Sequence, residues 1–204
     1  VPYYSGDVEN HVIWGRSILN ESPGGFYERD FHNYSVPNYP PISMLSFAIS
    51  VSFYDFVRNG ILFFDNFEIF PSKIVRIIDS DNLLISFLKL PAILLFIFSG
   101  LVIFNFGKLF KKKFKESIFY TILFLLNPSF IYLAVIWGQN DFTQVLFILG
   151  ALWFLLNNYF NWSIIFASLA ILSKQTALLI WGLFMITVFK LKGISKTFAG
   201  LIAA

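Results

Sequence analysis

The stretch Trp137-Gly138-Gln139-Asn140-Asp141 separates two apolar runs, residues 117–136 and 142–156. A carboxylate, two amides and a glycine between apolar segments of this length are costly unless they face water or a binding site. We therefore expect this polar break to form the outer mouth of a membrane-embedded active site, where Asp7 and Lys174 meet it.

The composition predicts an all-α integral membrane protein. Hydrophobic residues make up 57% of the chain and charged residues 13%, and there are 27 phenylalanines. Soluble domains carry about 25% charged residues. The chain has no cysteine, which excludes disulfides and thiolate metal sites, and its two histidines are too few for a histidine-rich metal site. The net charge of +3 does not indicate nucleic-acid binding, because the basic residues flank the apolar segments.

The chain begins with Val1 and ends in the apolar residues 199–204. We expect a fragment of a longer protein that lacks at least one preceding crossing and its C-terminal part.

Residues 1–82 read as a polar loop region outside the hydrocarbon, and residues 83–204 as a transmembrane helical module. A short helix is expected over residues 8–19, with Asp7 near its N-cap. The apolar residues 42–57 after Pro40-Pro41 are short for a crossing, and residues 58–82 mix apolar and charged side chains. Both segments are therefore expected to lie in the membrane interface as membrane-parallel helices.

The second part of the chain predicts crossings over residues 90–107, 118–137 and 142–156, with a kink at Asn127-Pro128. Residues 162–189 would form a helix of about 42 Å, which exceeds a hydrocarbon core of about 30 Å. Because Lys174-Gln175 lies in its middle, we expect two short pieces with this pair at the turn.

The distribution of charge predicts the topology. The positive-inside rule places the lysines at 108–115 and at 190–196 on the cytoplasmic side. Eight of the fifteen basic residues and one of the twelve acids then lie inside. This arrangement brings the N-terminal loop, the polar break and Lys174-Gln175 to the extracytoplasmic side.

Each candidate residue has a functional and a structural interpretation. Asp7 is a general base for a hydroxyl nucleophile, or a helix cap. Gln139 and Asp141 hydrogen-bond sugar hydroxyls or hold a divalent ion, or they cap the following helix. Lys174 binds a phosphate headgroup, or it forms an ion pair with Asp141. Gly138 and Asn140 are interpreted as turn residues.

Other side chains are interpreted more simply. The histidines His11 and His32 are expected to be solvated loop residues. The tryptophans Trp14, Trp137, Trp162 and Trp181 either stack on sugars or belong to interfacial belts and packing.

Several motifs in order resemble those of GT-C fold glycosyltransferases that use polyprenyl-phosphate sugars. The motifs are Gly6-Asp7, Tyr39-Pro40-Pro41, Leu126-Asn127-Pro128, Trp137-Gly138-Gln139-Asn140-Asp141 and Ser173-Lys174-Gln175. The chain looks most like mannosyltransferases related to the GPI mannosyltransferases, and less like the glucosyltransferases of lipid-linked oligosaccharide synthesis. The resemblance covers residues 3–190. The first crossing and the C-terminal helices that are usual in this family are not in this sequence.

The resemblance implies a transfer with inversion on the extracytoplasmic side, from a polyprenyl-phosphate or dolichyl-phosphate sugar to a lipid, glycan or protein acceptor. It implies that Asp7 is the catalytic base. It also implies that Gln139 and Asp141 line the site and that Lys174 and Gln175 lie near the donor phosphate. We further expect Glu9, His11 and Tyr39 to contact the substrate. No cofactor is required by this reading, a divalent metal is left open, and nucleic acid is not a partner.

The function expected is therefore that of a membrane hexosyltransferase for mannose or glucose, in a prokaryotic plasma membrane or an ER membrane. The alternative is a transporter or flippase for a lipid-linked or polar solute, since interrupted helices with midplane charges also suit transporters. A non-catalytic assembly subunit is a third interpretation.

Overall fold

The computed structural model describes residues 6–21 and 24–193, which are helical throughout apart from loops and turns. Two helices, α2 (Pro41–Asp65) and α4 (Asp81–Leu109), are long and apolar enough to cross a membrane within the described ranges. A bent pair of helices between residues 114 and 137 gives a third candidate span. The predicted all-helical class is thus confirmed, and the crossings predicted over residues 90–107 and 118–137 fall within candidate spans. The crossing predicted over residues 142–156 forms a helix too short to qualify as a span.

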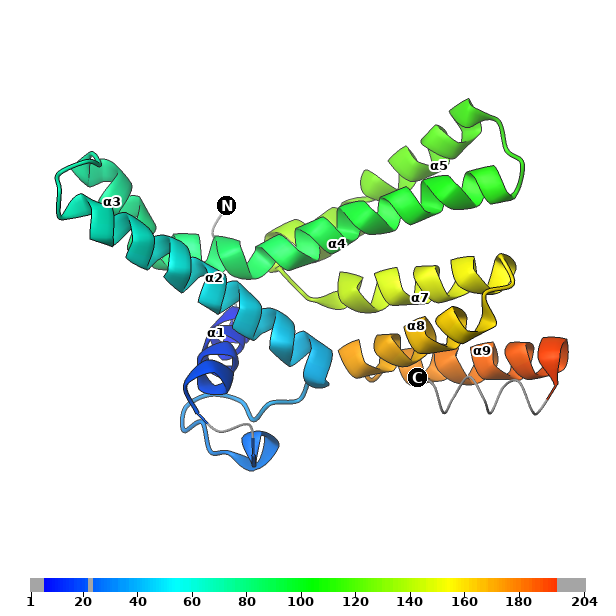
Figure 1. The fold of residues 1–204 in the computed structure, drawn as a ribbon, viewed down its shortest axis with the longest axis horizontal. Helices are drawn as coiled ribbons and strands as arrows, with labels where there is room; N and C mark the ends of the chain where they lie inside the picture. Colours follow the sequence, from blue (N-terminus) through cyan, green and yellow to red (C-terminus); the bar gives the residue numbers. More distant parts are fainter. Residues whose placement is uncertain (1–5, 22–23, 194–204) are drawn as a thin grey trace.

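α4 and α5 (Phe114–Leu125) form a hairpin around the lysine-rich turn at residues 110–113 (Figure 1). α4 is longer than the crossing predicted over residues 90–107, because the helix already begins after Ser80 and continues through Pro91. The two helices approach closely at Gly107, where an added Cβ would lie 2.1 Å from the Ser117 Oγ. Small residues at such a contact allow the close packing on which helix association in membranes depends.

The predicted kink at Asn127-Pro128 is confirmed. α5 ends at Leu125, and a short helix α6 (Pro128–Ile131) continues into the π-helix η2 (Tyr132–Trp137) after a bend of 52°. Asn127 caps the new start, because its side chain accepts a hydrogen bond from the Ser129 N–H at 3.0 Å. Pro128 occupies the first turn, where its missing N–H leaves no helical bond unmade.

α7 (Asp141–Leu156), α8 (Phe160–Ser173) and α9 (Ala177–Lys192) run beside one another in a second group (Figure 1). The predicted division of residues 162–189 is confirmed, since α8 ends at Ser173 and α9 begins at Ala177. These helices have 14 to 16 residues, which corresponds to about 21–24 Å. Each is shorter than a typical hydrocarbon core of about 30 Å.

The helix that contains residues 42–57 is longer than the apolar segment predicted from the sequence. α2 runs for 25 residues to Asp65, so by length and composition it qualifies as a span. The charged residues Asp55 and Arg58 do not end the helix, because Arg58 pairs with Asp79 beyond α3 (Ser72–Ile78). In Figure 1, α2 lies beyond the ends of α7 and α8 and not alongside them.

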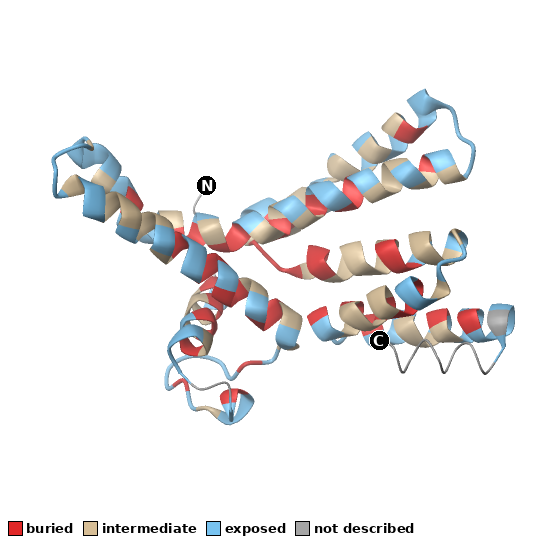
Figure 2. Cartoon of the chain, viewed as in Figure 1, coloured by how far each residue is buried: buried red, intermediate tan, exposed pale blue. Residues whose placement is uncertain are grey.

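Three separate hydrophobic clusters hold the helices together within the described residues. One fixes α1 (Gly6–Asn20) on α2 and the start of α4, and it includes Trp14, Phe47 and Leu84. A second joins α4, η2 and α7 through Phe96, Ala134 and Phe142, and a third joins α7, α8 and α9. Figure 2 shows buried residues where these helices face each other and exposed residues along their outer faces. Many exposed residues are large and apolar, as lipid-facing surfaces require.

Candidate functional site

Asp7 lies in the first turn of α1, in contact with the polar break more than a hundred residues along the chain. Its Oδ2 accepts hydrogen bonds from the Trp137 Nε1–H at 3.2 Å and from the Gln139 Nε2–H at 3.0 Å. The carboxylate is exposed, and within the described residues its Oδ1 has no hydrogen-bond partner. One oxygen is thus held in place while the other remains open to accept a proton.

Gln139 connects Asp7 to the first loop. Its amide nitrogen donates to Asp7, and its Oε1 accepts a hydrogen bond from the Tyr39 hydroxyl at 2.8 Å. Because both ends of the amide have partners, the orientation of this buried side chain is fixed. Burial, reinforced by the negative charges of Asp141 and Asp7, raises the pKa of Tyr39 to about 12. The Tyr39 hydroxyl therefore stays protonated and remains a donor.

Lys174 follows α8 directly and forms an ion pair with Asp141, the first residue of α7. Both side chains are 28% exposed. The Lys174 Nζ also lies 5.8 Å from the centroid of the Tyr39 ring, within the range of a cation–π contact. The structure therefore has the ion pair that was one interpretation of Lys174. Phosphate binding by this lysine stays a prediction.

The five residues Asp7, Gln139, Tyr39, Lys174 and Asp141 form one connected group. Asp7 does not touch Lys174 directly, since Gln139 and Tyr39 lie between them. Gln175 lies at the edge of this group, where its exposed Nε2 is 3.5 Å from the Asn38 carbonyl oxygen. Sequence positions 7, 39, 139, 141 and 174 are thus brought to one place by four different segments.

The local backbone of the break explains how Trp137 and Gln139 reach Asp7 together. The π-helix η2 ends at Gly138, whose φ of 78° is readily adopted only by glycine. The Gly138 and Gln139 N–H groups both donate to the Leu133 carbonyl at 3.0 Å. π-helical turns are rare and are frequent at functional sites. Gly138 was interpreted as a turn residue, and this is confirmed.

Lys89 was missed by the sequence reasoning. It is 5% exposed in α4, and its Nζ donates to the Ile136 carbonyl at 2.6 Å. Its stem lies under the break, because a Cβ on Gly138 would be 2.6 Å from the Lys89 Cγ. No described carboxylate is within ion-pair distance of it. A buried cation at the carbonyl end of a helix is favourable for the helix dipole, and an unpaired one marks a functional region.

Asn140 lies in the turn before α7, as interpreted, and it is also a buried hydrogen-bonding centre. Its Nδ2 donates to the Ser43 Oγ at 3.1 Å and to the Ser46 Oγ at 2.8 Å. Its Oδ1 accepts from the Thr143 hydroxyl at 2.6 Å. Ser43 in turn donates to the Ser173 carbonyl at 2.6 Å, next to Lys174. This network joins the starts of α2 and α7 to the end of α8.

Two predicted substrate-binding residues are placed differently. His11 is 3% exposed, and its ring stacks on Phe47 with centroids 4.0 Å apart, so it is a core residue and not a solvated one. Burial lowers the pKa of His11 to about 4, against the opposing effect of the Asp7 charge. Glu9 lines a different crevice, together with Arg16 and Asp81. It follows Asp7 by two residues on the same helix, so its side chain points to the opposite face of α1. Substrate contact by either residue would require another arrangement of α1.

Two of the tryptophans, Trp14 and Trp137, have different roles in the structure. Trp14 is buried and donates to the Ser35 carbonyl at 2.8 Å, which is a packing role, whereas Trp137 belongs to the candidate site. His32 is exposed and lies beside Asp30, as expected of a solvated loop residue.

A cavity of about 180 Å³ opens beside the ion pair. Its polar wall consists of Asp141, Gln144, Lys174 and Thr176. The apolar side chains of α6, η2 and α7 supply the other wall. The Thr176 hydroxyl donates to the Gln144 Oε1 at 2.8 Å. The Lys174 ammonium uses one of its three N–H donors for Asp141, so the other two remain for a ligand. A cavity with one charged and one apolar wall suits an amphiphile with an anionic head.

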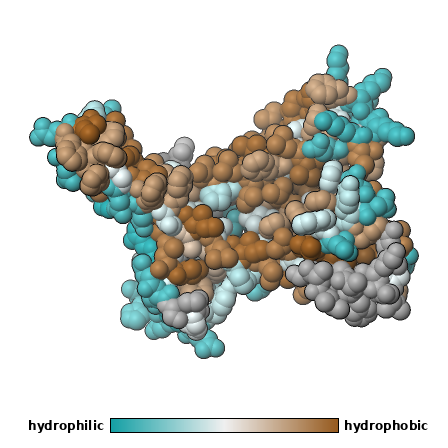
Figure 3. All heavy atoms as spheres, in the orientation of Figure 1, coloured by the Kyte–Doolittle hydropathy of each residue, from teal (hydrophilic) through white to brown (hydrophobic). Residues whose placement is uncertain are grey.

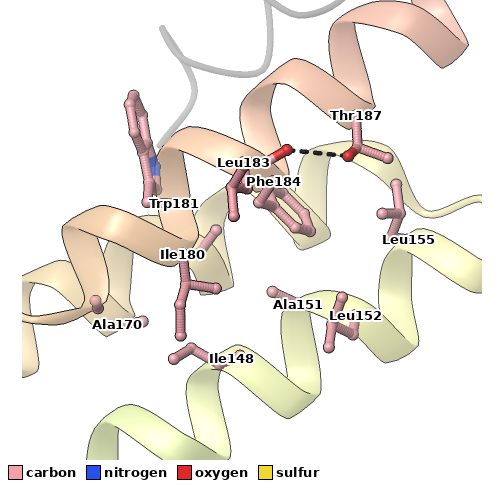
Figure 4. Close-up of a pocket in the computed structure, with 12 residues that line it drawn as sticks. Ile148, Ala151, Leu152, Leu155, Ala170, Ile180, Trp181, Leu183, Phe184 and Thr187 are labelled. Carbon is pink, nitrogen blue, oxygen red and sulfur yellow. Dashed lines mark hydrogen bonds between the residues drawn. The ribbon is translucent and has the colours of Figure 1, made fainter.

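A second cavity lies away from this chemistry, between α7, α8 and α9 (Figure 4). It is lined almost entirely by apolar side chains such as Ile148, Leu152 and Ile180. Its Thr187 hydroxyl donates to the Leu183 carbonyl at 2.9 Å, as the dashed line in Figure 4 marks. No charged group lines this cavity, so it offers no group for acid–base or anion chemistry.

No three histidine, aspartate or glutamate side chains gather within the described residues in a way that could hold a metal ion. In the candidate site, Asp7 and Asp141 belong to opposite ends of the connected group, so each would offer a metal a single carboxylate.

Comparison with known proteins gave no match: no family model, no curated protein and no solved structure is similar to this chain.

Proposed function

We propose that the chain is part of a membrane glycosyltransferase that moves a hexose, mannose or glucose, from a polyprenyl-phosphate donor to a lipid, glycan or protein acceptor. The observation that supports this most is the connected group of Asp7, Gln139, Tyr39, Asp141 and Lys174. It places a proton acceptor and a cation on either side of two neutral hydrogen-bonding side chains. Transfer of a sugar from a phosphate carrier needs both.

In the proposed reaction, the acceptor hydroxyl loses its proton to the Oδ1 of Asp7 and attacks the anomeric carbon. The bond between that carbon and the phosphate oxygen breaks, and its electron pair leaves with the polyprenyl phosphate. Attack from the face opposite the leaving group inverts the anomeric centre. Lys174 offsets the charge that develops on the phosphate, and Gln139 and Tyr39 orient the sugar or acceptor hydroxyls.

The proposed location is a membrane, with the site on the extracytoplasmic side. The lysines of the α4–α5 turn and Lys190 near the end of α9 would face the cytoplasm. The start of α7 and the end of α8 lie at the end of the molecule opposite the α4–α5 turn and the end of α9 (Figure 1). Asp141 and Lys174 of the connected group belong to these two helix ends. In this placement, α1 and its loop lie outside the hydrocarbon, and α2, which lies beyond the ends of α7 and α8, does not cross it (Figure 1).

The test is transfer of radiolabelled sugar from polyprenyl phosphate into lipid extracts by the protein reconstituted in vesicles. Asp7→Asn keeps the shape and both hydrogen-bond contacts but cannot take the proton, so we expect a loss of about 10²-fold or more in transfer. Glu28→Gln removes an exposed acid of the same loop and is the matched control, expected to leave transfer unchanged.

Near-normal transfer by Asp7→Asn would overturn the assignment of the base. Movement of the labelled lipid across the membrane without sugar transfer would support a transporter in place of the enzyme.

A further inference from the structure

An apolar groove of about 400 Å³ lies between α4 and α7, at the end of the molecule away from the candidate site. Its walls include Phe98, Leu101 and Val102 from α4, and Leu146, Trp153 and Phe154 from α7. α4 and α7 diverge along this half of the molecule, as Figure 1 shows. The groove is therefore open between two hairpins, and its apolar lining is suited to a hydrocarbon chain.

Basic side chains lie where the groove ends. Asn105 belongs to the lining, and Lys108 follows one helical turn later on α4. The turn then adds exposed Lys111, Lys112 and Lys113. Figure 3 shows hydrophilic atoms gathered at this tip next to the hydrophobic face of the helices. Nearby, Glu116 is the single acid between residues 82 and 140.

We propose that this groove and the lysine turn together bind an anionic phospholipid, with an acyl chain in the groove and the phosphate at the lysines. A neutral lipid would use the groove but not the charges, and a soluble anion would use the charges but not the groove. Basic pockets between transmembrane helices are known to hold anionic headgroups. The inference rests on the proposed membrane location, but it does not depend on sugar transfer.

The headgroup half is tested by native mass spectrometry of the protein in mixed micelles or nanodiscs. Bound phosphatidylglycerol is compared with bound phosphatidylcholine at equal supply. Each lysine at a membrane surface contributes roughly fivefold in affinity for anionic lipid. Lys111→Gln/Lys112→Gln should therefore lower phosphatidylglycerol retention at least tenfold. The matched control, Lys73→Gln/Arg76→Gln, removes two exposed basic residues of α3 and should change nothing.

The acyl-chain half uses variants that fill the groove. Leu101 is 51% exposed, so Leu101→Trp adds bulk to the groove without disturbing a packed contact. We expect it to reduce phosphatidylglycerol retention at least fivefold. Leu123→Trp on α5 enlarges a side chain that is 61% exposed and lines no part of the groove, and it should leave retention unchanged.

Three results would overturn the proposal. Equal retention of the two lipids by the unaltered protein would remove the anionic specificity. An effect of the lysine variants without an effect of Leu101→Trp would indicate surface attraction alone. An effect of Leu101→Trp on both lipids without one of the lysine variants would indicate a neutral-lipid groove. Helical circular dichroism and size-exclusion profiles identify any variant that fails to fold, and such a variant is replaced by Val102→Phe or Lys113→Gln.

Discussion

Lys174 carries a positive charge into the turn of a short apolar hairpin, and Asp141 is its counter-charge. The structural and the functional interpretation of this lysine make different predictions. Lys174→Met alone leaves the Asp141 carboxylate unpaired and should lower the free energy of unfolding by roughly 1–3 kcal/mol, less than a fully buried pair because both groups are partly solvated. Lys174→Met/Asp141→Asn should recover most of that loss.

Sugar transfer should not recover in the double variant, because the proposed phosphate-binding charge is still missing. Thermal unfolding in detergent and the transfer assay measure the two effects, and Asp141→Asn alone shows how much transfer depends on the carboxylate. Recovery of both stability and transfer in the double variant would leave Lys174 with a structural role only.

His11 links stability to pH. Its pKa is about 4 in the folded protein because it is buried, and about 6.5 when the chain is unfolded. Between these values the unfolded state binds the proton and the folded state does not, so stability falls as the pH is lowered from 7 to 4. His11→Phe keeps the stack on Phe47 and removes this proton linkage.

We therefore expect unfolding curves at pH 7 and pH 4 to show a smaller acid loss for His11→Phe than for the unaltered protein, by about 3 kcal/mol. Parallel losses in the two proteins would mean that His11 is solvated in the folded state.

At the scale of residues, the sequence predicted the polar members of the site but not their supports. Asp7, Gln139 and Lys174 are conspicuous because each is a polar group placed next to an apolar segment. Lys89 was missed because the predicted crossing began at residue 90, and it contacts a backbone carbonyl that no pattern marks. His11 was misjudged because the aromatic partners that bury it come from residues 39 and 47.

At the scale of elements, Asn140 determines how α2, α7 and α8 meet. Asn140→Ala removes the amide N–H group that donates to the Ser43 and Ser46 hydroxyls. It also removes the amide oxygen that accepts a hydrogen bond from the Thr143 hydroxyl. Buried polar groups that lose their partner cost about 1–3 kcal/mol each. We expect the variant to lower the midpoint of thermal unfolding clearly, together with transfer, since Ser173 and Lys174 depend on the same network.

Asn105→Ala provides the control for that experiment. Asn105 is exposed and donates to the Leu101 carbonyl of its own helix, so its removal should change stability by no more than about 0.5 kcal/mol. A similar small effect of Asn140→Ala would mean that the junction is held by apolar packing alone.

Helix ends could be predicted from the sequence where a proline or a pair of polar residues interrupts an apolar segment. The proline at 128 and the polar pair at 174–175 mark breaks that the structure contains. The full length of α2 could not be predicted from the sequence, because Asp55 and Arg58 interrupt the apolar segment. In the folded chain Arg58 pairs with Asp79 and Asp55 is only half-buried, and the helix continues past both. The π-helix of η2 also has no sequence signal apart from the glycine that follows it.

At the scale of the whole molecule, one surface is proposed for function and another for anchoring. The connected group lies where α1, the polar break and the α8–α9 turn meet. The lysine turn lies at the far end of α4 (Figure 1). A membrane between these two ends would place the site and the lysines on opposite sides. The longest connections between the ends are α4 and the bent pair formed by α5 with α6 and η2.

Cysteine labelling tests this arrangement most directly, since the chain contains no cysteine of its own. Single variants Asn10→Cys, Gln175→Cys and Lys112→Cys would be treated with a membrane-impermeant maleimide in sealed vesicles of known orientation. The account predicts that Asn10→Cys and Gln175→Cys react from the extracytoplasmic side, and that Lys112→Cys reacts from the cytoplasmic side. Labelling of Asn10→Cys and Gln175→Cys from opposite sides would contradict the shared site, and with it the proposed enzyme.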